Sequence, residues 1–184
     1  MPILGIIASS QQSGFISTTS YESIATVTVG SGGSSGISFT SIPSTYTHLQ
    51  VRGIWAHSAS NVAAVIGFNS ATTSYTQHLL SGNGSSVSVG ANTTSDGITG
   101  IGCTISVGAN NFGSSVIDIL DYKNTNKNKV ARVLAGQNVN GDGIIRMYSG
   151  MWVSTNAISS IEITPNSSTF NQYTQWALYG IKGA

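Results

Sequence analysis

Apolar and polar residues alternate with a period of two in several stretches of the chain. Successive side chains of a β-strand point to opposite faces, so this period is typical of a strand with one buried face. The stretch 48–55 is the clearest example, with Leu49, Val51, Gly53 and Trp55 on one face and His48, Gln50, Arg52 and Ile54 on the other.

Short apolar stretches rich in β-branched residues continue along the chain, separated by turns of Ser, Asn and Gly. None shows the 3.6-residue period of an amphipathic helix, and many short strands between turns are typical of an antiparallel sandwich or barrel. We therefore expect an all-β, antiparallel, jelly-roll-like β-sandwich. Its strands are predicted at Ser23–Val29, Ile37–Ile42, His48–Trp55, Val62–Phe68, Tyr75–Leu80, Val87–Ala91, Ile98–Ser106, Val116–Tyr122, Val130–Gln137, Ile144–Val153, Ile158–Ile163 and Gln175–Ile181.

The first two strands are expected to form a hairpin. The first ends at the turn sequence Gly30-Ser31-Gly32-Gly33, the second follows at once, and Pro43 closes the pair. Glycine-rich turns between two β-branched stretches are typical of hairpins.

Charged residues are scarce. The 184 residues include seven Lys or Arg and six Asp or Glu, which is 7% of the chain, against about one quarter in an average domain. With a formal net charge of +1, no strong field would draw the chain onto nucleic acid or an anionic membrane. Catalysis and metal binding rely on converging carboxylates, imidazoles and thiols, so we expect no enzyme activity and no cofactor.

Two further features concern the single cysteine of the chain and its cellular location. The single cysteine, Cys103, rules out an intrachain disulfide, and its alternating surroundings predict a buried, unreactive thiol. The apolar start Met1–Ala8 lacks a basic flank and is shorter than a membrane span. We therefore expect synthesis in a cytoplasm, without export or membrane anchoring.

Residues 1–20 are predicted to form an extended N-terminal arm, and residues 21–184 a single β-sandwich domain. An apolar tip so short cannot build a core of its own. It either folds back onto its own domain or docks on a neighbouring subunit, and we favour docking. The apolar residues of this assembly arm are Ile3, Leu4, Ile6 and Ile7.

One stretch gathers four of the seven positive charges of the chain. We expect it to be a solvated loop between two strands, and it is also the candidate contact loop for an acidic protein surface or an anion. No aromatic residues alternate with the charges, so stacking on nucleic-acid bases is not indicated. The four residues are Lys123, Lys127, Lys129 and Arg132.

The stretch 138–145 matches the first half of a calcium-binding loop, with Gly143 at its sixth position. The bidentate Glu required at the twelfth position is replaced by Ser149. Gly141-Asp142-Gly143 between two apolar stretches is more typical of a hairpin turn, which we predict here.

The three histidines, His48, His57 and His78, are expected to be polar residues on strand faces, and the aromatic residues are expected to serve packing. His48 and His78 could approach each other across a sheet, but zinc requires three or four ligands. Tryptophans are expected to pack in the core or between subunits, and three aromatic residues of the last strands could line one sheet face. The tryptophans are Trp55, Trp152 and Trp176, and the shared face would hold Tyr148, Trp152 and Tyr179.

Segments spread over most of the chain carry a resemblance. They are 3–10 (ILGIIASS), 21–27 (YESIATV), 42–49 (IPSTYTHL), 117–125 (IDILDYKNT), 150–152 (GMW) and 177–181 (ALYGI). These segments resemble small virion structural proteins of tailed bacteriophages, most closely those of phages that infect cyanobacteria. The resemblance implies a jelly-roll-like sandwich that forms homotrimers, either as a capsid decoration (cement) protein or as part of a tail or head fibre.

Of these two roles we favour the capsid decoration protein, which would dock on the virion through its apolar arm. Its partners would be the major capsid protein or other virion proteins. The alternative is a receptor-binding module of a fibre, whose polar loops and exposed aromatic rings would contact host surface glycans. In both roles the chain is made in the host cytoplasm and ends at the particle surface. A polysaccharide depolymerase is disfavoured because acids are so few.

Overall fold

The computed structural model describes residues 20–94, 96–104, 108 and 110–183 of the chain. The predicted assembly arm, with Ile3, Leu4, Ile6 and Ile7, lies outside the described residues. Within the described ranges the secondary structure is entirely β, and no helix is present that could cross a membrane.

The strands follow the alternating stretches of the sequence closely. They are β1 (Tyr21–Thr28), β2 (Ile37–Phe39), β3 (His48–Trp55), β4 (Val62–Phe68), β5 (Tyr75–Gly82), β6 (Val87–Thr94), β7 (Ile98–Thr104), β8 (Gly113–Leu120), β9 (Lys129–Asn138), β10 (Gly143–Trp152), β11 (Ile161–Pro165) and β12 (Gln175–Ile181).

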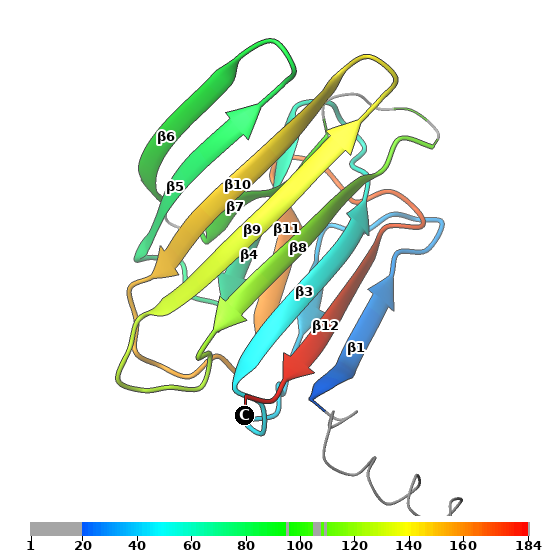
Figure 1. The fold of residues 1–184 in the computed structure, drawn as a ribbon. Helices are drawn as coiled ribbons and strands as arrows, with labels where there is room; N and C mark the ends of the chain where they lie inside the picture. Colours follow the sequence, from blue (N-terminus) through cyan, green and yellow to red (C-terminus); the bar gives the residue numbers. More distant parts are fainter. Residues whose placement is uncertain (1–19, 95, 105–107, 109, 184) are drawn as a thin grey trace, which may run out of the picture.

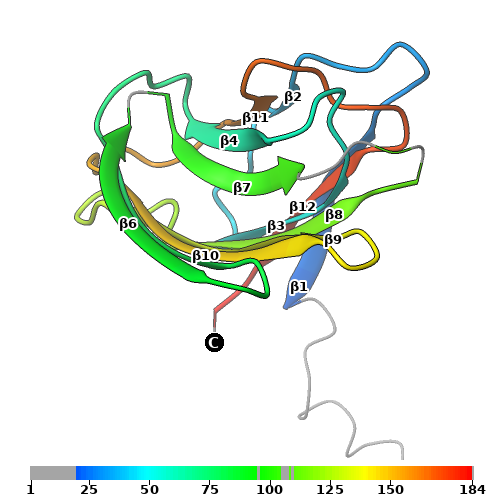
Figure 2. The same cartoon turned by 90° about the horizontal axis from the view of Figure 1, so that it is seen from above.

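These strands form two antiparallel sheets that pack face to face. The larger sheet has eight strands in the order β1-β12-β3-β8-β9-β10-β5-β6, and the smaller has four in the order β2-β11-β4-β7. Figure 1 looks onto the larger sheet, and Figure 2 shows it curving around the smaller one. The predicted all-β antiparallel sandwich is confirmed.

The chain passes repeatedly from one sheet to the other. The links β1 to β2, β2 to β3, β3 to β4, β7 to β8 and β11 to β12 all cross between the strands β1, β12, β3 and β8 of the larger sheet and the four strands of the smaller sheet. The hairpins β9–β10 and β5–β6 extend the larger sheet beyond β8. The larger sheet therefore has an outer face much wider than the smaller sheet that covers its inner face.

The hairpin predicted from the first two strands is wrong. β1 pairs with β12, whereas β2 pairs with β11 in the other sheet. The glycine-rich turn exists, since the Gly33 amide donates to the Gly30 carbonyl at 3.1 Å, but it carries the chain across to the second sheet. A period of two identifies a strand and its buried face without identifying its neighbour.

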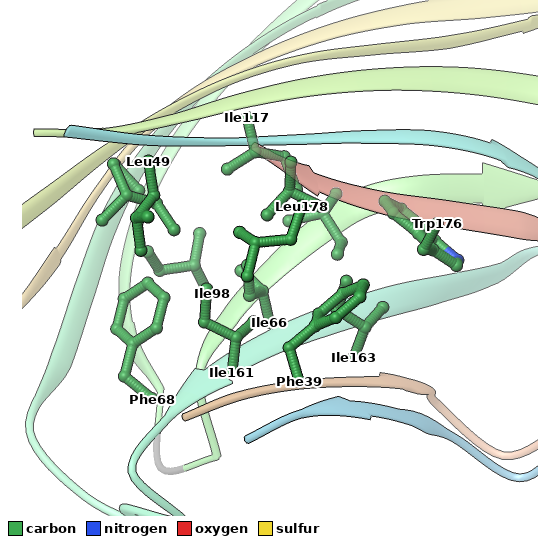
Figure 3. Close-up of a cluster of buried hydrophobic side chains, with 14 of the residues drawn as sticks. Phe39, Leu49, Ile66, Phe68, Ile98, Ile117, Ile161, Ile163, Trp176 and Leu178 are labelled. Carbon is green, nitrogen blue, oxygen red and sulfur yellow. The ribbon is translucent and has the colours of Figure 1, made fainter. Parts of the chain in front are cut away.

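The core lies between the two sheets, as the alternation predicts. Figure 3 shows Leu49, Ile117 and Leu178 of the larger sheet facing Ile66 and Ile161 of the smaller one. All of these side chains are fully buried.

The tryptophans belong to this core too. The predicted packing of Trp55, Trp152 and Trp176 is confirmed, because each is at most 5% exposed. The single face predicted for Tyr148, Trp152 and Tyr179 is wrong for Tyr179. Its neighbour Leu178 points into the core, so Tyr179 lies on the outer face.

Candidate functional site

The predicted contact loop joins β8 to β9, and one of its four basic residues is buried. The Lys129 side chain is fully enclosed. Its ammonium donates hydrogen bonds to the carbonyl oxygens of Asn124 at 2.6 Å, Lys127 at 2.7 Å and Thr155 at 3.1 Å. Lys129 therefore holds the loop together from inside and must be removed from the set of surface contact residues.

The other three basic residues are exposed but do not form one cluster. Lys123 donates to the Ser44 carbonyl at 3.0 Å, and Lys127 forms an ion pair with Asp121 at 2.7 Å. Arg132 lies on the outer face of β9, beyond the loop. The loop thus presents two lysines to solvent, each already engaged with the protein.

The electrostatics of the loop follow from these contacts. Burial lowers the pKa of the Lys129 ammonium, and the Asp121 carboxylate offsets part of this effect. The hydrogen bond from Lys127 holds the pKa of Asp121 below its ordinary value. These charges stabilise the loop and leave little free charge for a strong anion site.

The few carboxylates are used structurally in a similar way. Glu22 pairs with Lys182 at 2.6 Å, and Asp118 accepts a hydrogen bond from Gln50 at 2.6 Å. Glu162 accepts one from the Ser70 hydroxyl at 2.8 Å. The Asp142 carboxylate accepts the Gly143 amide at 2.8 Å within the β9–β10 turn. The hairpin turn predicted at Gly141-Asp142-Gly143 is confirmed, because Asn138 and Gly143 are paired across it.

The histidines do not converge. His48 lies on β3 and His78 on β5, with β8, β9 and β10 between these strands, so the two do not approach each other. The polar strand face expected for His57 is wrong, because His57 is fully buried against the rings of Trp55 and Phe170. In the part of the chain that the structure describes, no three His, Cys, Asp or Glu residues are grouped to hold a metal ion.

The outer face of the larger sheet carries an apolar surface that the sequence reasoning did not single out. Eight of the large hydrophobic side chains exposed there form two rows over six adjacent strands, with Val89, Val87 and Ile145 at 77%, 74% and 58%. We call this surface the apolar outer face; its residues are Ile54, Leu80, Val87, Val89, Val116, Leu134, Ile145 and Met147.

Strand register arranges this face in two parallel rows across the sheet. One row is continuous: Val116, Leu134, Met147, Leu80 and Val89 are successive cross-strand neighbours. In the other row large and small residues are mixed, in the order Ile54, Ser114, Gly136, Ile145, Gly82 and Val87.

The small residues of the second row form the floor of a groove. Its lining includes Gly82, Ser114 and Gly136, with Leu134 and Ile145 beside them, and its volume is about 870 Å³. Without large side chains at these positions, the backbone of the sheet can be approached closely. The groove opens beside the turns that end the β5–β6 and β9–β10 hairpins, at the upper end of the sheet in Figure 1.

A signal for this face was present in the sequence. Several strands carry apolar residues at adjacent positions, such as Val116-Ile117, Val133-Leu134 and Ile144-Ile145. A strand with one solvated face should instead alternate apolar and polar residues. Two apolar faces on strands of one sheet indicate a second contact besides the core.

Beside the apolar rows, the outer face carries an aromatic and polar cluster near β1. The Tyr21 and Tyr179 rings stack at 5.0 Å, and the Arg52 guanidinium lies over both, at 5.4 and 5.6 Å. Gln50 accepts hydrogen bonds from Tyr21 and Arg52. These side chains satisfy one another and fix the edge strand β1 to the sheet.

Comparison with known proteins assigns neither a family nor a function to this chain. No protein-family model matches the chain, and neither the curated proteins nor the solved structures contain a match.

Proposed function

We propose that the chain is a structural protein of a tailed bacteriophage particle and, within that class, a capsid decoration protein. The observation that carries the proposal is the apolar outer face on a protein that has very few charged residues. The largest continuous apolar patch on the surface of a protein often has a function and marks an interaction site. In a protein that assembles with others, burial of such a face against a partner would stabilise the assembly.

The strand order supports the same proposal. A jelly roll has two four-stranded sheets with connections that cross between them, and β1-β12-β3-β8 over β2-β11-β4-β7 follows that plan. The resemblance in sequence implies a sandwich of this kind in virion proteins that form homotrimers. We infer that the two added hairpins widen one sheet to provide a face for assembly.

Decoration would act through binding equilibria. A protein that binds only the assembled shell, and is present at a free concentration [L], stabilises the shell by RT ln(1 + [L]/Kd) for each binding site. Threefold symmetry multiplies weak contacts, because the second and third subunits bind at high effective concentration. The major capsid protein is the partner we propose, and neutral, hydroxyl-rich loops would face solvent at the particle surface.

Copy number on the particle tests this role. Purified virions that encode the chain would be analysed by quantitative gel densitometry against the major capsid protein. We expect a stoichiometric ratio set by the number of capsomers. A ratio that leaves only the few copies of a tail or fibre position would overturn the decoration role and leave the structural role standing.

A second candidate, a receptor-binding module, is favoured by one specific observation. Tyr173 is 68% exposed and has a φ of 70°, which is uncommon for a bulky residue. It borders a polar groove whose lining includes Thr169, Asn171 and Gln172. An exposed ring beside amide and hydroxyl groups is suited to stack on a sugar.

Glycan-array binding by the full chain tests this second candidate. If the groove binds glycans, Tyr173→Ala should abolish the signal, whereas Tyr21→Ala, which removes a partly exposed ring elsewhere, should preserve it. Absence of binding by the unmodified chain would exclude this role.

A further inference from the structure

The size of the apolar outer face limits what can cover it. It crosses six strands, and five spacings of about 4.8 Å make it about 24 Å long. Each of its two rows occupies about 7 Å along the strands, so the face is about 14 Å wide and covers roughly 340 Å². Stable interfaces between folded proteins bury about 800 Å² on each partner. The face is too small to hold a second sandwich by itself, and its shape suits an extended peptide.

The chain contains a segment of matching length and chemistry. Residues 2–8 (PILGIIA) carry no charged or hydrogen-bonding side chain. In an extended conformation seven residues span about 23 Å, which is the length of the face. The glycine and serine floor of the groove gives such a segment room to lie against the sheet, with Leu134 and Ile145 as walls.

The position where the described chain begins shows how the segment could reach a neighbour. Ser20 immediately precedes β1, where Tyr21 pairs with Ile181. This end of the sheet is opposite the end that carries the β5–β6 and β9–β10 turns and the groove (Figure 1). The eleven residues 9–19 can span at most about 36 Å, which is enough to bridge two copies placed end to end.

We propose that the apolar outer face of one copy binds segment 2–8 of a neighbouring copy. The inference rests on the proposed assembly function and deepens it by naming the partner of the face, a second copy of this chain. Each copy gives a segment to one neighbour and receives one from another, which is a heterologous contact that closes into a ring when the rotation between copies allows it.

Cysteine cross-linking between copies tests the proposal. In a background with Cys103→Ser, one preparation carries Ile6→Cys and a second carries Leu134→Cys, and the two are mixed under oxidising conditions. We expect a disulfide-linked pair of about twice the 19.0 kDa mass of the chain. Leu120→Cys is the matched control, since Leu120 of β8, like Leu134 of β9, is an exposed leucine on the outer side of the larger sheet but lies beyond the apolar rows. It should give several-fold less product.

Two results would overturn the proposal. The first is failure of the mixture to cross-link while a single chain carrying both Ile6→Cys and Leu134→Cys closes an internal disulfide, because the segment then covers its own domain. The second is equal product with Leu120→Cys and Leu134→Cys, or none with either. Neither result changes the copy number on particles, so the proposed function is tested separately.

A charge placed in the face gives an independent readout. Met147→Glu should convert the oligomer to monomer in sedimentation, whereas Ser149→Glu, two residues along the same outer side of β10, should leave the oligomer intact. Equal loss in both variants, or in neither, would contradict the proposal.

Discussion

The surroundings of His57 strongly affect its titration. It is fully buried, its ring lies 5.4 Å from that of Trp55 and 5.3 Å from that of Phe170, and its Nδ1 donates to the Val62 carbonyl at 3.1 Å. Burial lowers the pKa of His57 to about 4. The native state therefore holds a neutral imidazole where the unfolded chain would hold a charged one at mildly acidic pH.

This lowered pKa predicts a loss of stability in acid. The contribution of His57 is complete above the unfolded pKa of about 6.5 and declines as the pH falls toward 4, because the unfolded state binds the proton first. We expect a loss of about 3 kcal/mol in the free energy of unfolding between pH 7 and pH 4. Urea titrations at several pH values measure it. His57→Gln should remove this part of the slope, and the exposed His78→Gln should retain it.

Lys129 has a structural role that its charge alone would not suggest. Lys129→Met keeps the side-chain volume but leaves the carbonyls of Asn124, Lys127 and Thr155 without their donor. Leaving a buried acceptor unsatisfied costs about 1–3 kcal/mol, so we expect a loss of at least that size in the free energy of unfolding. Lys127→Met, which removes only a surface ion pair, should cost clearly less. Similar losses in both variants would contradict the role assigned to Lys129.

At the scale of the elements, glycines in the strands make room for large rings. A Cβ atom on Gly113 of β8 would overlap the Trp55 ring, and one on Gly53 of β3 would overlap Trp176. Trp55 cannot move easily, because its Nε1 donates to the Ser115 hydroxyl at 2.7 Å. Neighbouring strands are thus locked together by a ring on one and a glycine on the next.

This packing makes Gly113→Ala destabilising. Overpacking a well-filled core costs about 1–3 kcal/mol, and thermal unfolding followed by circular dichroism should show the lower Tm. Gly30→Ala is the control, because nothing lies within 4 Å of the added Cβ, and it should leave the Tm nearly unchanged. An unchanged Tm for Gly113→Ala would mean that the Trp55 ring is not confined as described.

The strands and their buried faces could be predicted from sequence because the period of two is a local property. The turn at 138–143 was predictable for the same reason. The partner of β1 was not, since pairing depends on residues far away along the chain. The burial of Lys129 also escaped prediction, because it depends on three carbonyl groups that converge only when the loop folds. The apolar outer face could have been inferred from adjacent apolar pairs such as Ile144-Ile145.

At the scale of the whole molecule, the scarcity of charge and the width of the larger sheet both favour contacts through apolar side chains over contacts through charges. An eight-stranded sheet covered on its inner face by four strands leaves an outer surface to be solvated or buried in a contact. Hydroxyl and amide groups are abundant in this protein, and ion pairs are few among the residues that the structure describes. In the proposed assembly, apolar contacts would therefore supply most of the binding free energy. The charges of the contact loop between β8 and β9 would supply less.

Ionic strength distinguishes these two modes of assembly. Exposed charges are screened within about 10 Å at 0.1 M salt and about 3 Å at 1 M, whereas apolar contacts persist or strengthen in salt that is excluded from the surface. If the apolar outer face forms the contact, the dissociation constant of the oligomer, measured by sedimentation, should stay level or fall as NaCl rises from about 0.05 to about 1 M. Lys123→Gln with Lys127→Gln should change it little. Weakening by salt, matched by weakening in that double variant, would instead make the loop between β8 and β9 the site of assembly.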